Sequence, residues 1–127
     1  MAGKQRRHFF RVEIELQGCC RLVNGFLAGP SVGVRFLDLS AGGALLEVPE
    51  PLPVGQALRV ELEVDEPPLS LRSRAAVVRA WEREGRSYAG VAFRDLDKRG
   101  KAAITRFVFA EARRTGVGAA YVEVGAA

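Results

Sequence analysis

Short segments in which apolar and polar residues alternate are the feature that most constrains the fold of this chain. From Val12 to Gln17 the alternation is strict, which is the pattern of a strand with one buried face. Similar alternating or apolar segments recur between turn signals such as Asn24-Gly25 and Glu84-Gly85. The predicted strands cover residues 12–22, 32–37, 44–48, 58–64, 69–81 and 88–93. Six short strands joined by tight turns predict a mainly β fold, a closed or nearly closed antiparallel barrel.

The period of the apolar residues changes after Phe93. Apolar positions then fall at spacings of three and four, which predicts an α-helix over about residues 97–114. Asp95 or Asp97 can cap its start, and Thr115-Gly116 ends it. One face of this helix must pack against another element, and the barrel is the partner that we expect. The remaining residues fit either a short strand or an irregular end.

Length and composition indicate one folded domain. The chain has 127 residues, of which 48% are hydrophobic and 27% charged, a balance typical of globular proteins. We expect a basic arm over residues 1–11, the barrel and its helix over 12–116, and a tail over 117–127. No apolar run is long enough to span a bilayer or to act as a secretory signal, so we expect a cytoplasmic protein without a membrane partner.

The sequence contains few residues that could form a catalytic or metal-binding site. His8 is the only histidine, and it falls in the arm, which positions a catalytic base poorly. Cys19 and Cys20 are adjacent, so in a strand they point to opposite faces and do not form a disulfide. No metal-ligand spacing is present either. We therefore expect a protein that is not an enzyme and that needs no metal or cofactor.

Positive charge gathers at the N-terminus. The formal net charge is +4, and four basic residues precede the first acidic residue, Glu13. These residues are Lys4, Arg6, Arg7 and Arg11. Such an arm suits an anionic ligand, although charge alone fits a solvated leader better.

Two arginines of this arm are spaced for joint binding. In an extended chain Arg7 and Arg11 lie on the same side about 13 Å apart, on the side of Glu13. Guanidinium groups donate in pairs to phosphate and to guanine, and they stack on flat rings. Two arginines at this spacing are common in basic sequences, so the pair becomes informative only together with a second motif.

The second motif is Asp38-Leu39-Ser40-Ala41-Gly42-Gly43, expected at the turn between the second and third predicted strands. Asp38 can accept hydrogen bonds from guanine N1 and N2, and Ser40 can donate to a phosphate or a base. Gly43 can adopt angles that other residues avoid and lets a ligand come close. The alternative is a polar turn in which Asp38 and Ser40 bind local amides.

Together the motifs R-x3-R and D-x-S-x-x-G resemble those of the PilZ domain family, from Gln5 to about Arg114. The segment Gly90-Val91-Ala92-Phe93 is similar to the family's last strand. The resemblance implies a six-stranded barrel that binds cyclic di-GMP between the arginine arm and the second motif. It also implies that Arg6 is an additional basic contact. Trp81 is placed like an aromatic residue that packs on guanine in some members, and a core position is the alternative.

The function that this resemblance implies is a cyclic di-GMP receptor or adaptor. It would change conformation on binding the messenger and signal to a partner protein. One alternative is a PilZ-like interaction domain that binds no nucleotide. Another is a small barrel that binds single-stranded nucleic acid, which the ten aromatic residues support weakly because most of them fall at predicted core positions of strands or on the predicted helix.

Overall fold

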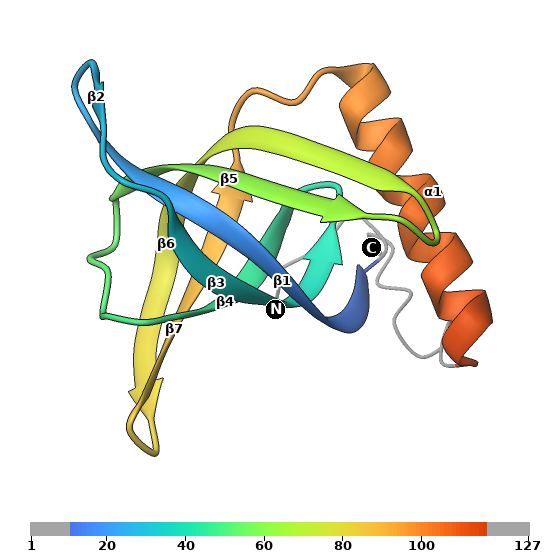
Figure 1. Ribbon diagram of the computed structural model, residues 1–127, viewed down its shortest axis with the longest axis horizontal. Coiled ribbons are helices and arrows are strands. Elements are labelled where there is room, and N and C mark those ends of the chain that lie inside the picture. Colours follow the sequence, from blue (N-terminus) through green and yellow to red (C-terminus); the bar gives the residue numbers. More distant parts are fainter. Residues whose placement is uncertain (1–10, 117–127) are drawn as a thin grey trace, which may run out of the picture.

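A six-stranded antiparallel barrel with one helix forms the described part of the protein (Figure 1). The computed structural model describes residues 11–116. Its elements are β1 (Arg11–Asn24), β2 (Leu27–Ala28), β3 (Val32–Ser40), β4 (Gly43–Val48), β5 (Ala57–Val64), β6 (Leu69–Arg83), β7 (Arg86–Phe93) and α1 (Lys98–Thr115). The strands are ordered β2-β1-β3-β4-β7-β6-β5, and β5 also pairs with β1, which closes the ring. The predicted barrel is therefore confirmed.

The alternation of side chains along each strand builds the core. On β5, Leu58, Val60 and Leu62 are buried, whereas Arg59 and Glu63 face solvent. All the other strands of the ring contribute inward residues in the same way. Each fully buried Leu, Val or Phe contributes about 1.5–3 kcal/mol relative to an exposed one. Because this pattern has a period of two, the core strands could be recognised in the sequence.

Helix α1 packs against the barrel with one face. Ile104, Phe107 and Val108 are almost completely buried on this face, and α1 contacts β1, β3 and β6. Asp97 caps its start by accepting a hydrogen bond of 2.8 Å from the backbone N–H of Gly100, and Gly116 ends it with a φ of 77°. The predicted helix is confirmed. Across residues 11–116, the structure contains no helix that is long and apolar enough to cross a membrane.

One feature of the fold was absent from the prediction, a narrow hairpin at the end of β1. Strand β2 has only two residues and pairs with β1 through Asn24↔Leu27 and Val23↔Ala28. Gly25, with a φ of 65°, makes the tight turn that this pairing needs. Two residues are too few to show a period, which is why the sequence did not reveal the strand. In Figure 1 this hairpin stands clear of the barrel wall.

The adjacent cysteines are free thiols, as predicted. Cys20 points into the core and Cys19 is half-buried. Burial raises the pKa of the Cys20 thiol, and the neighbouring Cys19 raises it further. Cys20 therefore stays protonated and acts as a small core residue.

Candidate functional site

The outer face of β3, β4, β7 and β6 gathers most of the motif residues that fall in the described chain. Residues paired across neighbouring strands share a face, so the register defines rows of side chains. One row is Asp38↔Leu45↔Gly90↔Arg79. The next row is Arg35↔Glu47↔Tyr88↔Trp81. The two ends of a row are three strand spacings apart, about 14 Å, which suits a ligand of dinucleotide size.

Arg11 and Asp38 meet at one edge of this face. Arg11 pairs with Ser40 across β1 and β3, on the side of β1 where the alternation predicted it. Its Nη1 lies 3.4 Å from Oδ2 of Asp38. The other oxygen of Asp38 accepts a hydrogen bond of 3.1 Å from the backbone N–H of Leu45. Contacts from β1 and β4 therefore hold the Asp38 carboxylate in one orientation.

One donor of Arg11 is left without an acceptor. Its Nε is the buried side-chain nitrogen or oxygen that lacks a hydrogen-bond partner among the described residues. Leaving a buried donor unsatisfied costs about 1–3 kcal/mol, and more for a charged group. A phosphate oxygen or a guanine edge would satisfy such a donor. The geometry thus points to an acceptor that comes from outside residues 11–116.

The second motif lies at the turn between β3 and β4, as predicted, but the two strands extend further into it than predicted. Asp38 and Ser40 belong to β3 and Gly43 to β4, so only Ala41 and Gly42 connect them. Ser40 Oγ accepts from the backbone N–H of Gly42 at 3.2 Å and lies 3.4 Å from the carbonyl oxygen of Gly43. Leu39, between the two polar residues, is fully buried. The two strands were predicted too short at this turn because Asp, Ser and Gly are typical turn residues.

Gly43 does not use the backbone freedom that was predicted for it, whereas the close approach of a ligand at this position stays a prediction. Its φ is not positive, and a Cβ at this position would lie 2.1 Å from the carbonyl oxygen of Val91. Gly43 pairs with Ala92, so the backbones of β4 and β7 approach each other closely here. The absence of a side chain is thus required by the barrel wall, independently of any ligand.

Trp81 lies outside the core, on the same outer face. Its ring stacks on that of Tyr88, with centroids 5.7 Å apart and planes inclined by 22°. The guanidinium carbon of Arg79 lies 5.0 Å from the centre of the Trp81 ring. Gly90, beside Arg79, adds no side chain to this part of the face. Tyr88 and Arg79 were not predicted as neighbours of Trp81. The pairing of Tyr88 with Trp81 depends on a bulge in β6 after Val77, whereas Arg79 lies two residues before Trp81 on the same strand and so shares its face.

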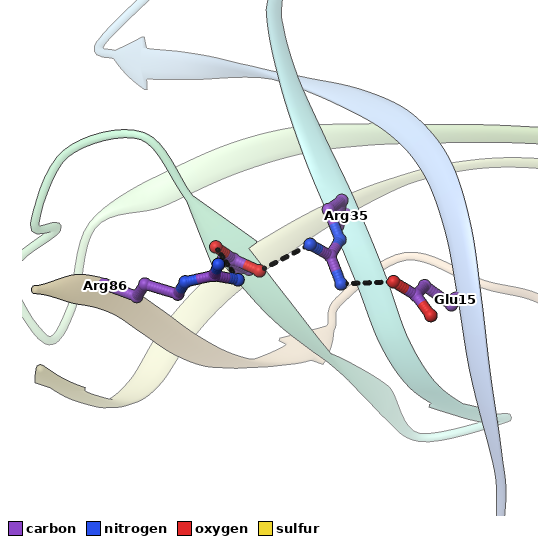
Figure 2. A network of polar contacts seen from close by, with 4 residues as sticks. Glu15, Arg35 and Arg86 are labelled. Carbon is purple, nitrogen blue, oxygen red and sulfur yellow. Dashed lines mark hydrogen bonds and ion pairs between the residues drawn. The ribbon is translucent and has the colours of Figure 1, made fainter. Parts of the chain in front are cut away.

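An ionic network borders this face (Figure 2). Arg35 of β3 bridges the carboxylates of Glu15 on β1 and Glu47 on β4, and Arg86 of β7 also contacts Glu47. The distances to Glu47 are 3.2 Å from Arg35 and 3.4 Å from Arg86. The network ties four strands together next to the stacked rings.

Two predicted site residues, Arg6 and Arg7, lie outside the described residues, as does most of the predicted arm. Within 11–116, no group of three or more His, Cys, Asp or Glu side chains is arranged to hold a metal ion. The geometry of the candidate site therefore rests on Arg11, Asp38 and the outer face described above.

Solved structures with a similar fold include three of interest. The inhibitor of motility MotI/DgrA from Bacillus subtilis is 14% identical, with a TM-score of 0.66 over 88% of this chain and 53% of that one. YcgR from Escherichia coli in complex with c-di-GMP is 20% identical, with a TM-score of 0.71 over 91% and 50%. The PilZ domain of YcgR with c-di-GMP is 19% identical, with a TM-score of 0.67 over 88% and 98%. The chain thus spans about half the length of the first two proteins.

The family assignment rests on the sequence. No curated protein matches the chain significantly. The family model described as the PilZ domain, however, matches residues 5–110, a range that includes both arginines of the first motif and all of the second. With the observed barrel and its C-terminal helix, the match establishes that this chain belongs to the PilZ domain family.

Proposed function

We propose that the chain is a receptor for cyclic di-GMP and binds it on the outer face of β3, β4, β7 and β6 without transforming it. The observation that carries the proposal is the buried Arg11 Nε, which lacks an acceptor and lies beside the oriented carboxylate of Asp38. Two structures with a similar fold contain c-di-GMP according to their descriptions.

Each chemical part of the ligand has a complementary group on this face. Arg11, with Arg7 and Arg6 of the predicted arm, supplies donors for the phosphates and for guanine edges. Asp38 supplies an acceptor for guanine N1 and N2, and Ser40 a hydroxyl. Trp81 offers a flat face for a base, and Arg79 already lies against its ring as a cation.

We further propose that binding rearranges the arm over residues 1–11 and that the changed surface signals to a partner protein in the cytoplasm. Arg11 supports this because it is the first residue of β1 and so joins the arm to the barrel. Slower amide exchange in residues 4–10 at saturating cyclic di-GMP is the expected outcome. Unchanged exchange would contradict the rearrangement even if binding itself were measured.

Calorimetric titration with cyclic di-GMP tests the binding, with GMP and a short single-stranded oligonucleotide as controls. We expect the cyclic dinucleotide alone to bind tightly. Absence of binding would favour the interaction-domain alternative, and tight oligonucleotide binding would favour a nucleic-acid function.

The Asp38→Ala variant tests the assignment of the guanine acceptor. Its loss of affinity should be larger for cyclic di-GMP than for cyclic di-AMP, because adenine lacks the N1 and N2 donors. Equal losses for the two ligands would mean that Asp38 only shapes the end of β3.

A further inference from the structure

The hairpin at the end of β1 exposes apolar side chains at its tip. Phe26 is fully exposed and Leu27 is 77% exposed. Tight turns generally carry Gly, Asn, Asp, Ser or Pro, and Gly25 alone provides the positive φ that this turn needs. Phe26 therefore has no evident part in forming the turn, and the hairpin extends away from the barrel wall (Figure 1).

A row of arginines crosses the barrel wall at the base of this hairpin. Arg21 pairs with Arg59 across β1 and β5, and Arg59 pairs with Arg74 across β5 and β6. All three residues are exposed. Arg21 donates to the carbonyl oxygen of Gly29 at 2.9 Å, but the guanidinium groups of Arg59 and Arg74 have no partner within residues 11–116. Like charges placed opposite each other on neighbouring strands destabilise a sheet. The arginine row therefore lowers the stability of the barrel, and no ion pair of Arg59 or Arg74 within residues 11–116 compensates for this.

The nearby acidic groups are already engaged. Glu61 lies 3.6 Å from Arg72, and its other oxygen lies 3.8 Å from the Cys19 thiol. Asp95 accepts from the hydroxyl of Ser73 and from the backbone N–H of Arg74. The charge of the arginine row therefore faces outward and is available to an external anion.

The apolar tip of the hairpin and the arginine row lie at different heights along β1. Arg21 precedes the last residue of β1, Asn24, by three positions, so the row lies about 10 Å from the turn. Amphipathic elements at a membrane surface bury their apolar side chains about 5–10 Å into the headgroup and acyl boundary. If Phe26 and Leu27 were buried to this depth, the arginines would lie among the lipid headgroups.

The residues around the hairpin also suit the surface of a membrane with anionic lipids. The sequence contains no Asp or Glu from Leu16 to Leu37. Four of the five exposed large hydrophobic residues of the described chain are Phe26 and Leu27 of the hairpin, Val54 of the connector before β5, and Val78 of β6. Gln56, directly before β5, joins this connector to the base of the hairpin, because its side-chain nitrogen lies 3.4 Å from the carbonyl oxygen of Val23.

We propose that this surface, made of Phe26, Leu27, Arg21, Arg59 and Arg74, docks peripherally on a lipid bilayer that contains anionic lipids. A convex apolar tip would need a matching pocket on a protein partner, whereas a bilayer adapts to it. No membrane partner was predicted from the sequence because no apolar run is long enough to span a bilayer, but peripheral docking does not need such a run. The proposal goes beyond nucleotide binding, since Arg11 and the hairpin lie at opposite ends of β1.

Sedimentation with vesicles tests the proposal. The full chain is mixed with vesicles of phosphatidylcholine alone, or of phosphatidylcholine and phosphatidylglycerol in equal amounts. We expect binding to the anionic vesicles that weakens as salt rises. Arg59→Ala and Arg74→Ala should each lower the partition coefficient about fivefold, and Phe26→Asp about tenfold or more. Phe26→Leu should retain most of the binding, and Arg113→Ala, an exposed arginine on α1, should change nothing.

Several outcomes would overturn the proposal. These are absence of binding to anionic vesicles, equal binding to neutral ones, or unchanged binding of Phe26→Asp. Binding of polyglutamate that depends on Arg59 but not on Phe26, with no vesicle binding, would instead identify a site for an acidic protein. Cyclic di-GMP titrations of the same variants should match the unsubstituted chain, so failure of the nucleotide proposal is distinguishable from failure of this one.

Discussion

The two outer faces of the barrel differ in how their arginines are paired. On the face of β3, β4 and β7, Arg35 and Arg86 are paired with carboxylates (Figure 2), and Arg11 of β1 is paired with Asp38 at its edge. On the face of β1, β5 and β6, Arg72 is paired with Glu61, whereas Arg59 and Arg74 lie directly opposite each other, and neither of their guanidinium groups has a partner among the described residues. Arginine therefore takes part in ion pairs on both faces, but only the second face carries two neighbouring arginines that are unpaired within residues 11–116.

This difference indicates which face is organised from within. Paired charges fix the orientation of side chains before a ligand binds, so the first face is preorganised. Among the described residues, the Nε of Arg11 is the one buried side-chain donor that still lacks a hydrogen-bond acceptor. On the second face, the side chains of Arg59 and Arg74 are not held in this way. Their charge can attract an external anion, and their contribution to folding is expected to be slightly unfavourable.

The largest effect is expected from Gly43→Ala, which tests whether the first face depends on close packing of β4 and β7. The new Cβ would lie 2.1 Å from a backbone oxygen that cannot move aside easily. We expect the free energy of unfolding to fall by about 3 kcal/mol in urea titrations. Gly33→Ala on β3, where a Cβ meets nothing within 4 Å, is the control and should change stability by less than about 0.5 kcal/mol. Equal effects would refute the packing argument.

Arg11→Ala should have the next largest effect, on ligand binding rather than on stability. Charge-assisted hydrogen bonds contribute about 1.5–3 kcal/mol each, so loss of one corresponds to at least a tenfold weaker affinity for cyclic di-GMP. Stability should change by less than about 1 kcal/mol, because the ion pair with Asp38 is partly exposed. Arg59→Ala, on the other face, should leave the calorimetric affinity unchanged. A melting temperature lowered as for a core substitution would contradict the assignment.

The sequence predicted the parts of this comparison that depend on order along one strand. The strands of the ring were recognised because inward and outward residues alternate, as in Leu58 to Leu62 on β5. The end of α1 followed from Thr115-Gly116, and its start was predicted as Asp95 or Asp97, of which Asp97 is the cap. Arg11 and Asp38 were identified as site residues through the family motif, although their contact with each other depends on the pairing of β1 with β3.

The parts that depend on register between strands could not be predicted. Arg21, Arg59 and Arg74 are distant in the sequence and become one row only when β5 closes the ring against β1. Tyr88 meets Trp81 because a bulge in β6 shifts the pairing with β7. Period and composition carry no information on such shifts, so both faces became visible only in three dimensions.

Glu47→Gln should have a moderate effect and sharpen the comparison. The Glu47 side chain is 18% exposed and joins Arg35 to Arg86, so neutralising it removes two ion pairs at once. We expect a loss of about 1 kcal/mol in the free energy of unfolding, partly suppressed by high salt. Glu50→Gln, in the exposed connector before β5, is the matched control. Identical stabilities of the two variants would show that the network of Figure 2 orders the wall without stabilising it.

The smallest effect, and the one of opposite sign, is expected from Arg74→Thr on the second face. Removing this charge relieves the repulsion by Arg59, and Thr is well suited to an exposed strand position. The free energy of unfolding should therefore rise by about 0.2–1 kcal/mol at low salt. The gain should shrink as salt rises, because the repulsion between two exposed groups is screened. Arg74→Lys keeps the charge and serves as the control for the change in side chain, so it should show neither the gain nor its salt dependence. Loss of more than about 1 kcal/mol in Arg74→Thr would mean that this guanidinium already stabilises the barrel, and the contrast between the two faces would then fail.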